Sequence, residues 1–217
     1  MFGYTHKKID QCDEQVQNLL DQWAKVPTVS SAQLPSSTKT RTTRHRNDPA
    51  YDIRGYLFEI LGTDLTQVPG FQENSIQTIM GEVGTDMTKW ATEKHFSSWL
   101  GLSPDPEISG GKTLKNKTKK VQSRAAKAFR LAARACGRST TALGAFYRRL
   151  KARIGAAKAI TAVAHKLAII FYKMVKNKVE YKELGEDYYS KKYHLRILKN
   201  LERKAKHYGL KLVAAEA

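Results

Sequence analysis

The spacing of apolar residues predicts a helical chain that begins with one amphipathic helix. Between Tyr4 and Ala24, apolar side chains recur at alternating steps of three and four residues, which is the seam of a heptad repeat. The seam consists of Ile9, Cys12, Val16, Leu19 and Trp23. A helix of three heptads is marginally stable alone. The seam therefore predicts packing, either on a partner (a second copy or another helix) or on the chain's own domain.

Residues 27–50 show no periodicity. Ser, Thr and Pro dominate their first half, and basic side chains cluster in the second. This composition predicts a linker. Its basic half would be either solvated or in contact with phosphate.

Helical periodicity returns after residue 50 and predicts a compact helical unit. Helices are expected at residues 52–61, 73–83, 92–100, 121–135, 141–155, 156–174 and 187–208. The run 156–174 is apolar nearly all round, which predicts a central buried helix. No stretch shows sustained strand alternation. The predicted fold class is all-α, divided into a coiled-coil helix (residues 1–26), a basic linker (27–50) and a helical domain (51–217).

One turn inside this unit is similar to a helix-hairpin-helix motif. Val68, Pro69, Gly70 and Phe71 precede the helix expected from Glu73. In such a turn, backbone N–H groups at a helix N-terminus can hold a phosphate. The second glycine that is usual in this motif is absent, so a plain turn remains the alternative.

Charge indicates the class of partner. The chain carries a formal net charge of +18, and nineteen Lys or Arg and no Asp or Glu lie between Ile108 and Val179. A surface of one sign repels itself unless an anionic partner lies against it, and a nucleic-acid backbone has the required charge density. The alternative is a solvated basic helix face.

Other chemistry is sparse. The two cysteines, Cys12 and Cys136, lie on the apolar stripes of predicted helices, which predicts buried thiols in a reducing compartment. No His–Cys spacing fits a zinc site, so no metal ligand is predicted. The start of the chain lacks a leader-like apolar run, and the most apolar run, 167–172, is too short to cross a bilayer. A cytoplasmic protein without a membrane partner is expected.

An ordered set of motifs resembles the transposases of the insertion-sequence one-ten family. The set comprises Glu82–Met87, Lys94–Pro104, Ser109–Lys112 and Phe146–Leu150. The resemblance implies a prokaryotic, nucleoid-associated DNA recombinase that acts in transposition of an insertion sequence. It also implies a structured guide RNA that pairs with DNA, and self-association through the N-terminal helix.

The resemblance also implies a catalytic residue. Members of this family use a serine nucleophile in a Ser-Gly motif, and the matching residue here is Ser109. They hold magnesium in a separate acidic domain joined by a coiled coil. That domain has no counterpart in these residues, so the chain is expected to be inactive alone and to carry no cofactor itself. A binding remnant that contacts guide RNA or element ends is the alternative.

The residues around Ser109 suit phosphate chemistry. A serine hydroxyl is a weak nucleophile unless a base, a metal or a cationic environment activates it. The helix expected from Val121 would direct its positive end toward the site. The nucleic-acid-binding candidates are Lys112, Lys115, Lys117, Lys119, Lys120, Arg124, Arg148 and Arg149.

Overall fold

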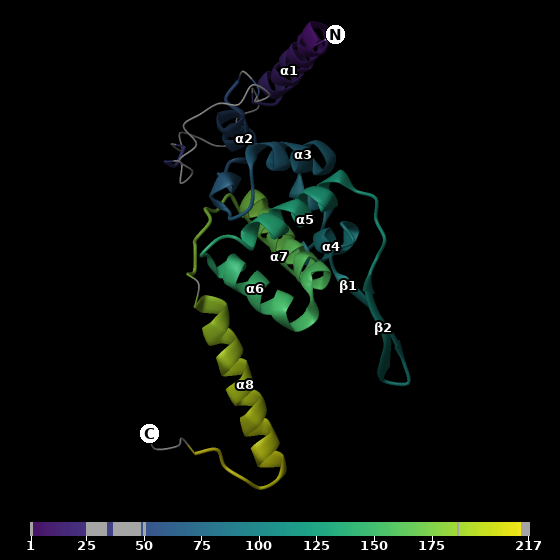
Figure 1. The fold of residues 1–217 in the computed structure, drawn as a ribbon, viewed down its shortest axis with the longest axis vertical. Helices are drawn as coiled ribbons and strands as arrows, with labels where there is room; N and C mark the ends of the chain where they lie inside the picture. Colours follow the sequence, from purple (N-terminus) through teal and green to yellow (C-terminus); the bar gives the residue numbers. More distant parts are fainter. Residues whose placement is uncertain (1, 25–33, 37–48, 50, 186, 214–217) are drawn as a thin grey trace.

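The computed structural model describes residues 2–24, 34–36, 49, 51–185 and 187–213, and it is predominantly helical. Figure 1 shows a helical body from which three elements project. The predicted linker lies almost wholly outside the described residues. The described helices are α1 (Phe2–Ala24), α2 (Ile53–Leu61), α3 (Glu73–Val83), α4 (Glu93–Trp99), α5 (Arg124–Cys136), α6 (Ala142–Ile154), α7 (Ala156–Asn177) and α8 (Tyr188–His207), with short 3₁₀ turns η1 (Leu65–Gln67) and η2 (Met87–Lys89).

The core forms around α7, which contacts α4, α5 and α6. Phe71, Phe96, Phe129 and Phe171 are fully buried between these helices, and their ring centroids lie 5.7–6.4 Å apart. Such offset and edge-to-face aromatic pairs add to the stability gained from burial. The prediction of a central buried helix is confirmed, as is the helical fold class.

The turn before α3 packs against α5. Gly70 has a φ of +89°, and a Cβ there would overlap with the Ala132 carbonyl oxygen and the Cys136 Sγ. The Cys136 thiol donates a hydrogen bond to the Pro69 carbonyl oxygen at 2.8 Å. Close helix packing therefore explains this glycine without a ligand. A phosphate-binding role for the turn stays a prediction.

A network centred on Asp64 fixes the loop between α2 and α3. Arg54 pairs with the Asp64 carboxylate at 2.5 Å, and Thr66 donates from its backbone and its hydroxyl. Burial alone would raise the pKa of Asp64, but hydrogen bonds from Arg54, Thr66 and Gln67 outweigh it and lower the pKa. Arg54 also donates to the Pro35 carbonyl oxygen at 2.6 Å, which attaches residues 34–36 to the body.

The start and the end of the body are joined directly. The Thr63 hydroxyl donates to the Val179 carbonyl oxygen at 2.9 Å, and the Lys178 ammonium donates to the Leu61 carbonyl oxygen at 2.8 Å. The chain thus leaves α7 beside the point where α2 ends.

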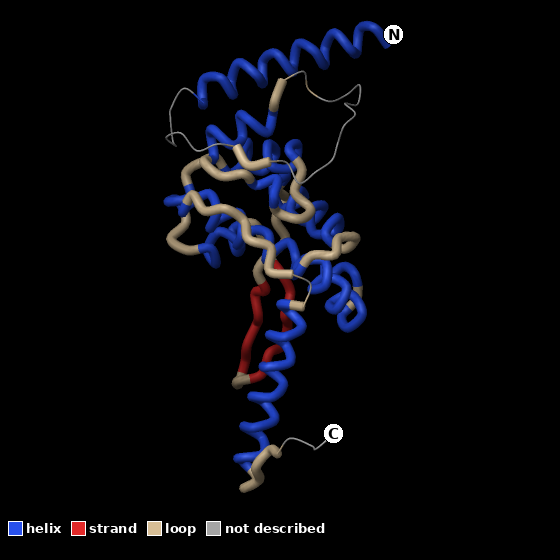
Figure 2. Tube along the Cα trace, turned by 90° about the vertical axis from the view of Figure 1, so that its left-hand side faces the viewer, coloured by secondary structure: helices blue, strands red, loops and turns tan. Residues whose placement is uncertain are grey.

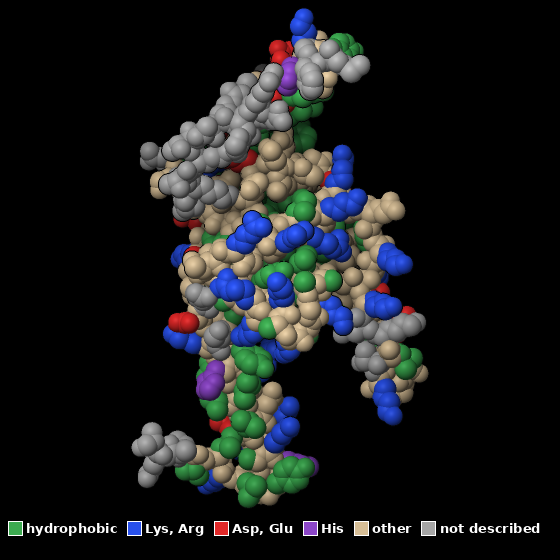
Figure 3. All heavy atoms as spheres, viewed as in Figure 1, with side chains coloured by type: hydrophobic (Ala, Val, Ile, Leu, Met, Phe, Trp, Pro, Cys, Tyr) green, Lys and Arg blue, Asp and Glu red, His purple; other side chains and the backbone are tan. Residues whose placement is uncertain are grey.

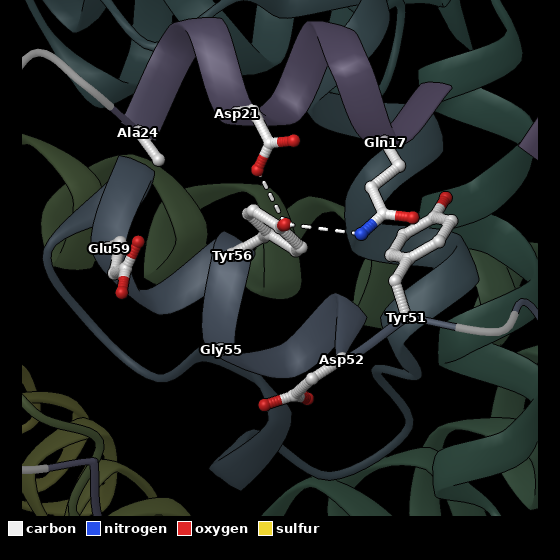
Figure 4. Close-up of a pocket in the computed structure, with 8 residues that line it drawn as sticks. All are labelled: Gln17, Asp21, Ala24, Tyr51, Asp52, Gly55, Tyr56 and Glu59. Atoms are coloured by element: carbon white, nitrogen blue, oxygen red, sulfur yellow. Dashed lines mark hydrogen bonds between the residues drawn. The ribbon is translucent and has the colours of Figure 1, made fainter. Parts of the chain in front are cut away.

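Helix α1 packs on α2 but leaves most of its heptad seam exposed. Leu20 is buried against the body. The Tyr56 hydroxyl of α2 donates to Asp21 at 2.5 Å and accepts from Gln17 at 3.5 Å, as Figure 4 shows. Val16 packs on the core, whereas the other seam residues, Ile9, Cys12, Leu19 and Trp23, are exposed. The helix uses a face beside the predicted seam for its own domain. The expectation that Cys12 is buried is wrong, while Cys136 is buried.

A β-hairpin, which the sequence patterns did not predict, projects from the body. Strands β1 (Pro104–Ser109) and β2 (Lys112–Thr118) pair antiparallel, with Ser109 opposite Lys112. Gly110 and Gly111 form the turn with φ values of +55° and +74°, as a two-residue hairpin turn requires. Figures 1 and 2 show that this hairpin and α8 extend from the same end of the body. No helix in the described ranges is long and apolar enough to cross a membrane.

Candidate nucleic-acid interface

Ser109 lies at the exposed tip of the hairpin. It is the last residue of β1, and all six β1 residues are exposed. A Cβ added to either turn glycine would meet no atom within 4 Å, so space around the tip is open. The backbone of a nucleic acid can therefore reach the Ser109 hydroxyl without a rearrangement of the body. Among the described residues, no base is hydrogen-bonded to that hydroxyl.

Four of the predicted binding lysines lie along the hairpin and its exit, with Lys112 opposite Ser109 and the other three toward the base of the hairpin. Lys112 and Lys117 lie on β2, Lys119 and Lys120 follow it, and all four are exposed. Lys119 lies 3.9 Å from the Asp105 carboxylate, with both side chains more than half exposed. Such an exposed pair contributes little, so Lys119 remains available to a phosphate. The side chain of Lys115 lies outside the described part of the structure.

The basic side chains of α5 continue this surface onto the body. Arg124, Lys127 and Arg134 are exposed, and Arg130 donates to the Gly101 carbonyl oxygen at 3.4 Å. In Figure 3, Lys and Arg side chains are spread across the visible face of α5 and α6, and acidic side chains are few there. The hairpin and this face together form what we term the basic surface.

Arg148 and Arg149 make intramolecular contacts. Arg148 donates to the carbonyl oxygens of Gly137 and Ser139 at 3.3 and 2.6 Å, although it remains exposed. Arg149 donates to the Tyr189 carbonyl oxygen at 2.9 Å and lies 4.8 Å from the Tyr193 ring centroid. Arg149 thereby holds the start of α8 against α6. A phosphate contact by either arginine stays a prediction.

The basic surface is not free of carboxylates in space. The Ala125 backbone N–H donates to Glu82 of α3 at 2.8 Å, and the Ala142 N–H donates to Glu183 at 2.8 Å. Burial would raise the pKa of Glu82, but hydrogen bonds from Ala125 and Ser123 outweigh it and lower the pKa. These two acids come from outside the acid-free sequence segment and cap the helices α5 and α6.

The helix after the hairpin differs from the prediction in where it begins. It begins at Arg124 with Ser123 as its N-cap, three residues after Val121. The Glu82 carboxylate already accepts from its first turn, and a contribution of this helix end to phosphate binding stays a prediction.

A second serine, at the base of the hairpin, is hydrogen-bonded to a histidine. The Ser103 hydroxyl lies 2.8 Å from the Ser97 hydroxyl and 3.3 Å from His165 Nδ1. His165 comes from α7, 62 residues away, and nothing in the local sequence indicates the contact. Ser103 directly precedes β1, so this chain of hydrogen bonds lies at the base of the hairpin.

The fit of the described residues to magnesium can be tested directly. In the described ranges, no group of three or more His, Cys, Asp or Glu side chains could hold a metal ion. The acids nearest to Ser109 in sequence are Asp105 and Glu107 on the same strand, and Asp105 is already close to Lys119. These residues do not assemble a magnesium site, so no catalytic step is assigned to a metal here.

Part of the chain matches a known protein family. Residues 62–148 match the model of the transposase IS116/IS110/IS902 family. The matched segment runs from the end of α2 into α6 and contains the whole hairpin with Ser109. No curated protein matches the chain.

Proposed function

We propose that this chain binds DNA through the basic surface and acts in the transposition of an insertion sequence. The observation that carries this proposal is the position of Ser109, exposed at the tip of a lysine-bearing hairpin inside the segment that matches a transposase family. A nucleophile that must reach a phosphodiester in a long polymer needs such a projecting position, since the polymer cannot enter a closed pocket.

The proposed chemistry uses the Ser109 hydroxyl as the nucleophile. Its oxygen attacks the phosphorus of a DNA phosphodiester, one P–O bond of the strand breaks, and the hydroxyl proton goes to the leaving oxygen. The new serine–phosphate bond retains the energy of the broken strand, so a strand-end hydroxyl can reverse the step without ATP. Lys112, which lies opposite Ser109, would stabilise the charge that develops on the phosphate oxygens, and Lys117 would hold the strand farther along the hairpin.

Other parts of the proposal follow from the family resemblance. Magnesium would be held by a separate acidic domain, and a structured guide RNA would share the basic surface and select the DNA sites. Self-association would use the exposed seam of α1. We expect little or no strand transfer by this chain alone.

Binding can be tested by its salt dependence. If the basic surface contacts about six phosphates, the logarithm of the association constant should fall against the logarithm of salt concentration with a slope near −5. Fluorescence anisotropy with a labelled duplex measures this slope. A flat response would contradict electrostatic binding. Lys112→Gln with Lys117→Gln should reduce the slope by about two, whereas Lys7→Gln with Lys8→Gln on α1 should not change it.

The nucleophile can be tested in cells that also supply the separate acidic domain, by following excision of the insertion sequence. Ser109→Ala should abolish the excised product in a PCR assay, because no other side chain replaces the attacking oxygen. Ser103→Ala is the matched control, since it removes the serine that contacts His165 and leaves the tip intact. If Ser103→Ala abolishes excision and Ser109→Ala does not, the reaction belongs to Ser103 and the proposal is overturned.

A non-catalytic role in binding DNA or guide RNA is the second candidate. It is favoured by two features of the described residues, namely that no base contacts Ser109 and no acidic group could hold a metal. In this case, Ser109→Ala would leave excision unchanged. A covalent adduct between the purified chain and DNA that Ser109→Ala removes would exclude this second candidate, and would also show that the chain needs no further domain.

A further inference from the structure

Two large apolar side chains are exposed beside Ser109 at the tip of the hairpin. Ile108 and Leu114 each expose 65% of their surface, and they lie within three residues of the glycine turn. Neither belongs to the hydrophobic core. Elsewhere on the hairpin, the described residues are polar, charged or proline. The tip therefore exposes two apolar side chains beside Ser109 and Lys112.

The strand register gives Leu114 an unusual place. Ile108 pairs with Thr113, and the preceding residue Glu107 pairs with Lys115, so the register shifts between the two pairs. Leu114 is the extra residue of a β-bulge and has no partner on β1. A bulge bends its strand and redirects a side chain. Here it adds a second exposed apolar side chain between the residues that pair with Ile108 and Glu107.

The dimensions and chemistry of the hairpin suit a groove of duplex DNA. A two-stranded ribbon fits within such a groove, and Lys112 and Lys117 can contact the phosphates along its edges. Proteins that deform DNA insert apolar side chains between neighbouring base pairs, where these side chains replace part of the lost base stacking. Two exposed apolar side chains at the end of a basic ribbon have the arrangement that this mode of binding requires.

We propose that Ile108 and Leu114 form a wedge that enters a base step of duplex DNA and unstacks it. This inference rests on the proposed DNA binding and adds a specific action to it. Ser109 is the next residue on β1, so the tip that opens the step would also bring the serine hydroxyl to the phosphodiesters around it. The wedge would thus select a distorted phosphodiester for attack.

Unstacking can be measured with short duplexes that carry 2-aminopurine at successive positions, because the fluorescence of this base rises when it unstacks. The wild-type chain should raise the signal at one or two adjacent positions of each bound duplex. Ile108→Ser with Leu114→Ser should lose this rise while anisotropy still reports binding, since the lysines remain. Leu131→Ser is the matched control, because this α5 leucine is also 65% exposed and lies on the body.

The outcomes separate the wedge from DNA binding itself. Tight binding by the wild type without any rise, or an equal rise in the double serine variant, would overturn the wedge and leave the proposed function intact. No binding by any variant would overturn the proposed function and the wedge with it. If light scattering shows that the wild type forms dimers and the double serine variant forms monomers, the two side chains belong to a protein contact, and the wedge is wrong.

Discussion

At the scale of residues, the hydrogen-bonded chain from Ser97 through Ser103 to His165 connects the base of the hairpin to the central helix. Burial, and then the charge of Lys166, lower the pKa of His165 below its usual 6.5. The folded protein therefore prefers the neutral imidazole. This preference makes part of the stability depend on pH.

The sign of that dependence follows from linkage. Below about pH 6.5 the unfolded chain binds a proton at His165 more readily than the folded chain, so the free energy of unfolding falls as the pH drops. Above that pH, His165 is neutral in both states and no longer changes the free energy of unfolding. Urea titrations from pH 7.5 to pH 5.5 should show a larger loss of stability for the wild type than for His165→Asn. Equal losses would show that His165 titrates alike in both states.

Single residues also show what the sequence could and could not predict. The heptad spacing identified the helix of Cys12 but not the face that packs. That face is fixed by the burial of Leu20 and by the hydrogen bond from Tyr56 of α2 to Asp21, and neither contact shows in the spacing. The segment rich in Lys and Arg, Ile108 to Val179, correctly indicated that this surface carries positive charge. It could not indicate that Glu82 and Glu183 lie on it, since both acids arrive from other segments.

At the scale of elements, the helices were predictable and the hairpin was not. Helices that pack on one side show their apolar period in sequence, whereas a two-stranded ribbon exposed on both faces has no alternation to detect. Pro104 and Pro106 further weaken a strand pattern. The dipeptide Gly110-Gly111 is a typical signal of a hairpin turn. The alternation of apolar and polar residues that normally flanks such a turn is absent here. The candidate nucleophile could be located in sequence, but its projection from the body could not.

The cap of α5 gives a prediction at this scale. Glu82→Gln should lower the free energy of unfolding by about 1 kcal/mol, because it removes a carboxylate that accepts from the first turn of the helix and complements its dipole. Urea denaturation measures this loss. Glu180→Gln is the control, since Glu180 is exposed in the segment after α7. A loss no greater than that of the control would mean that the Ala125 N–H is equally well satisfied without the charge.

At the scale of the whole molecule, α8 is distinguished by its exposure. Tyr189 packs on the core, but the helix beyond it projects from the body and exposes Leu195, Leu198 and Leu201 (Figure 1). The same projecting part carries Lys192, Arg196 and Lys199. The helix therefore adds charge near the hairpin end of the body and little to the core.

Truncation after Tyr193 tests this division. It removes six Lys or Arg and two Glu while keeping the Tyr193 ring that contacts Arg149. We expect the free energy of unfolding to change by less than about 1 kcal/mol, as for surface changes outside the core, and DNA affinity to fall most at low salt. Denaturation and anisotropy measure the two effects.

The control variant, Ile197→Ser with Leu201→Ser, keeps every charge of α8 and should bind DNA like the wild type. Loss of folding on truncation would show that α8 belongs to the core.

The two hydrogen bonds that join Thr63 to Val179 and Lys178 to Leu61 have a consequence for how such a body can be reused. Because the end of α2 and the end of α7 lie at neighbouring points on the body, a domain joined upstream or downstream need not pass through the interior. Segments before α2 or after Tyr193 can be exchanged, extended or shortened during evolution or in engineering, and the aromatic centre would be spared each time.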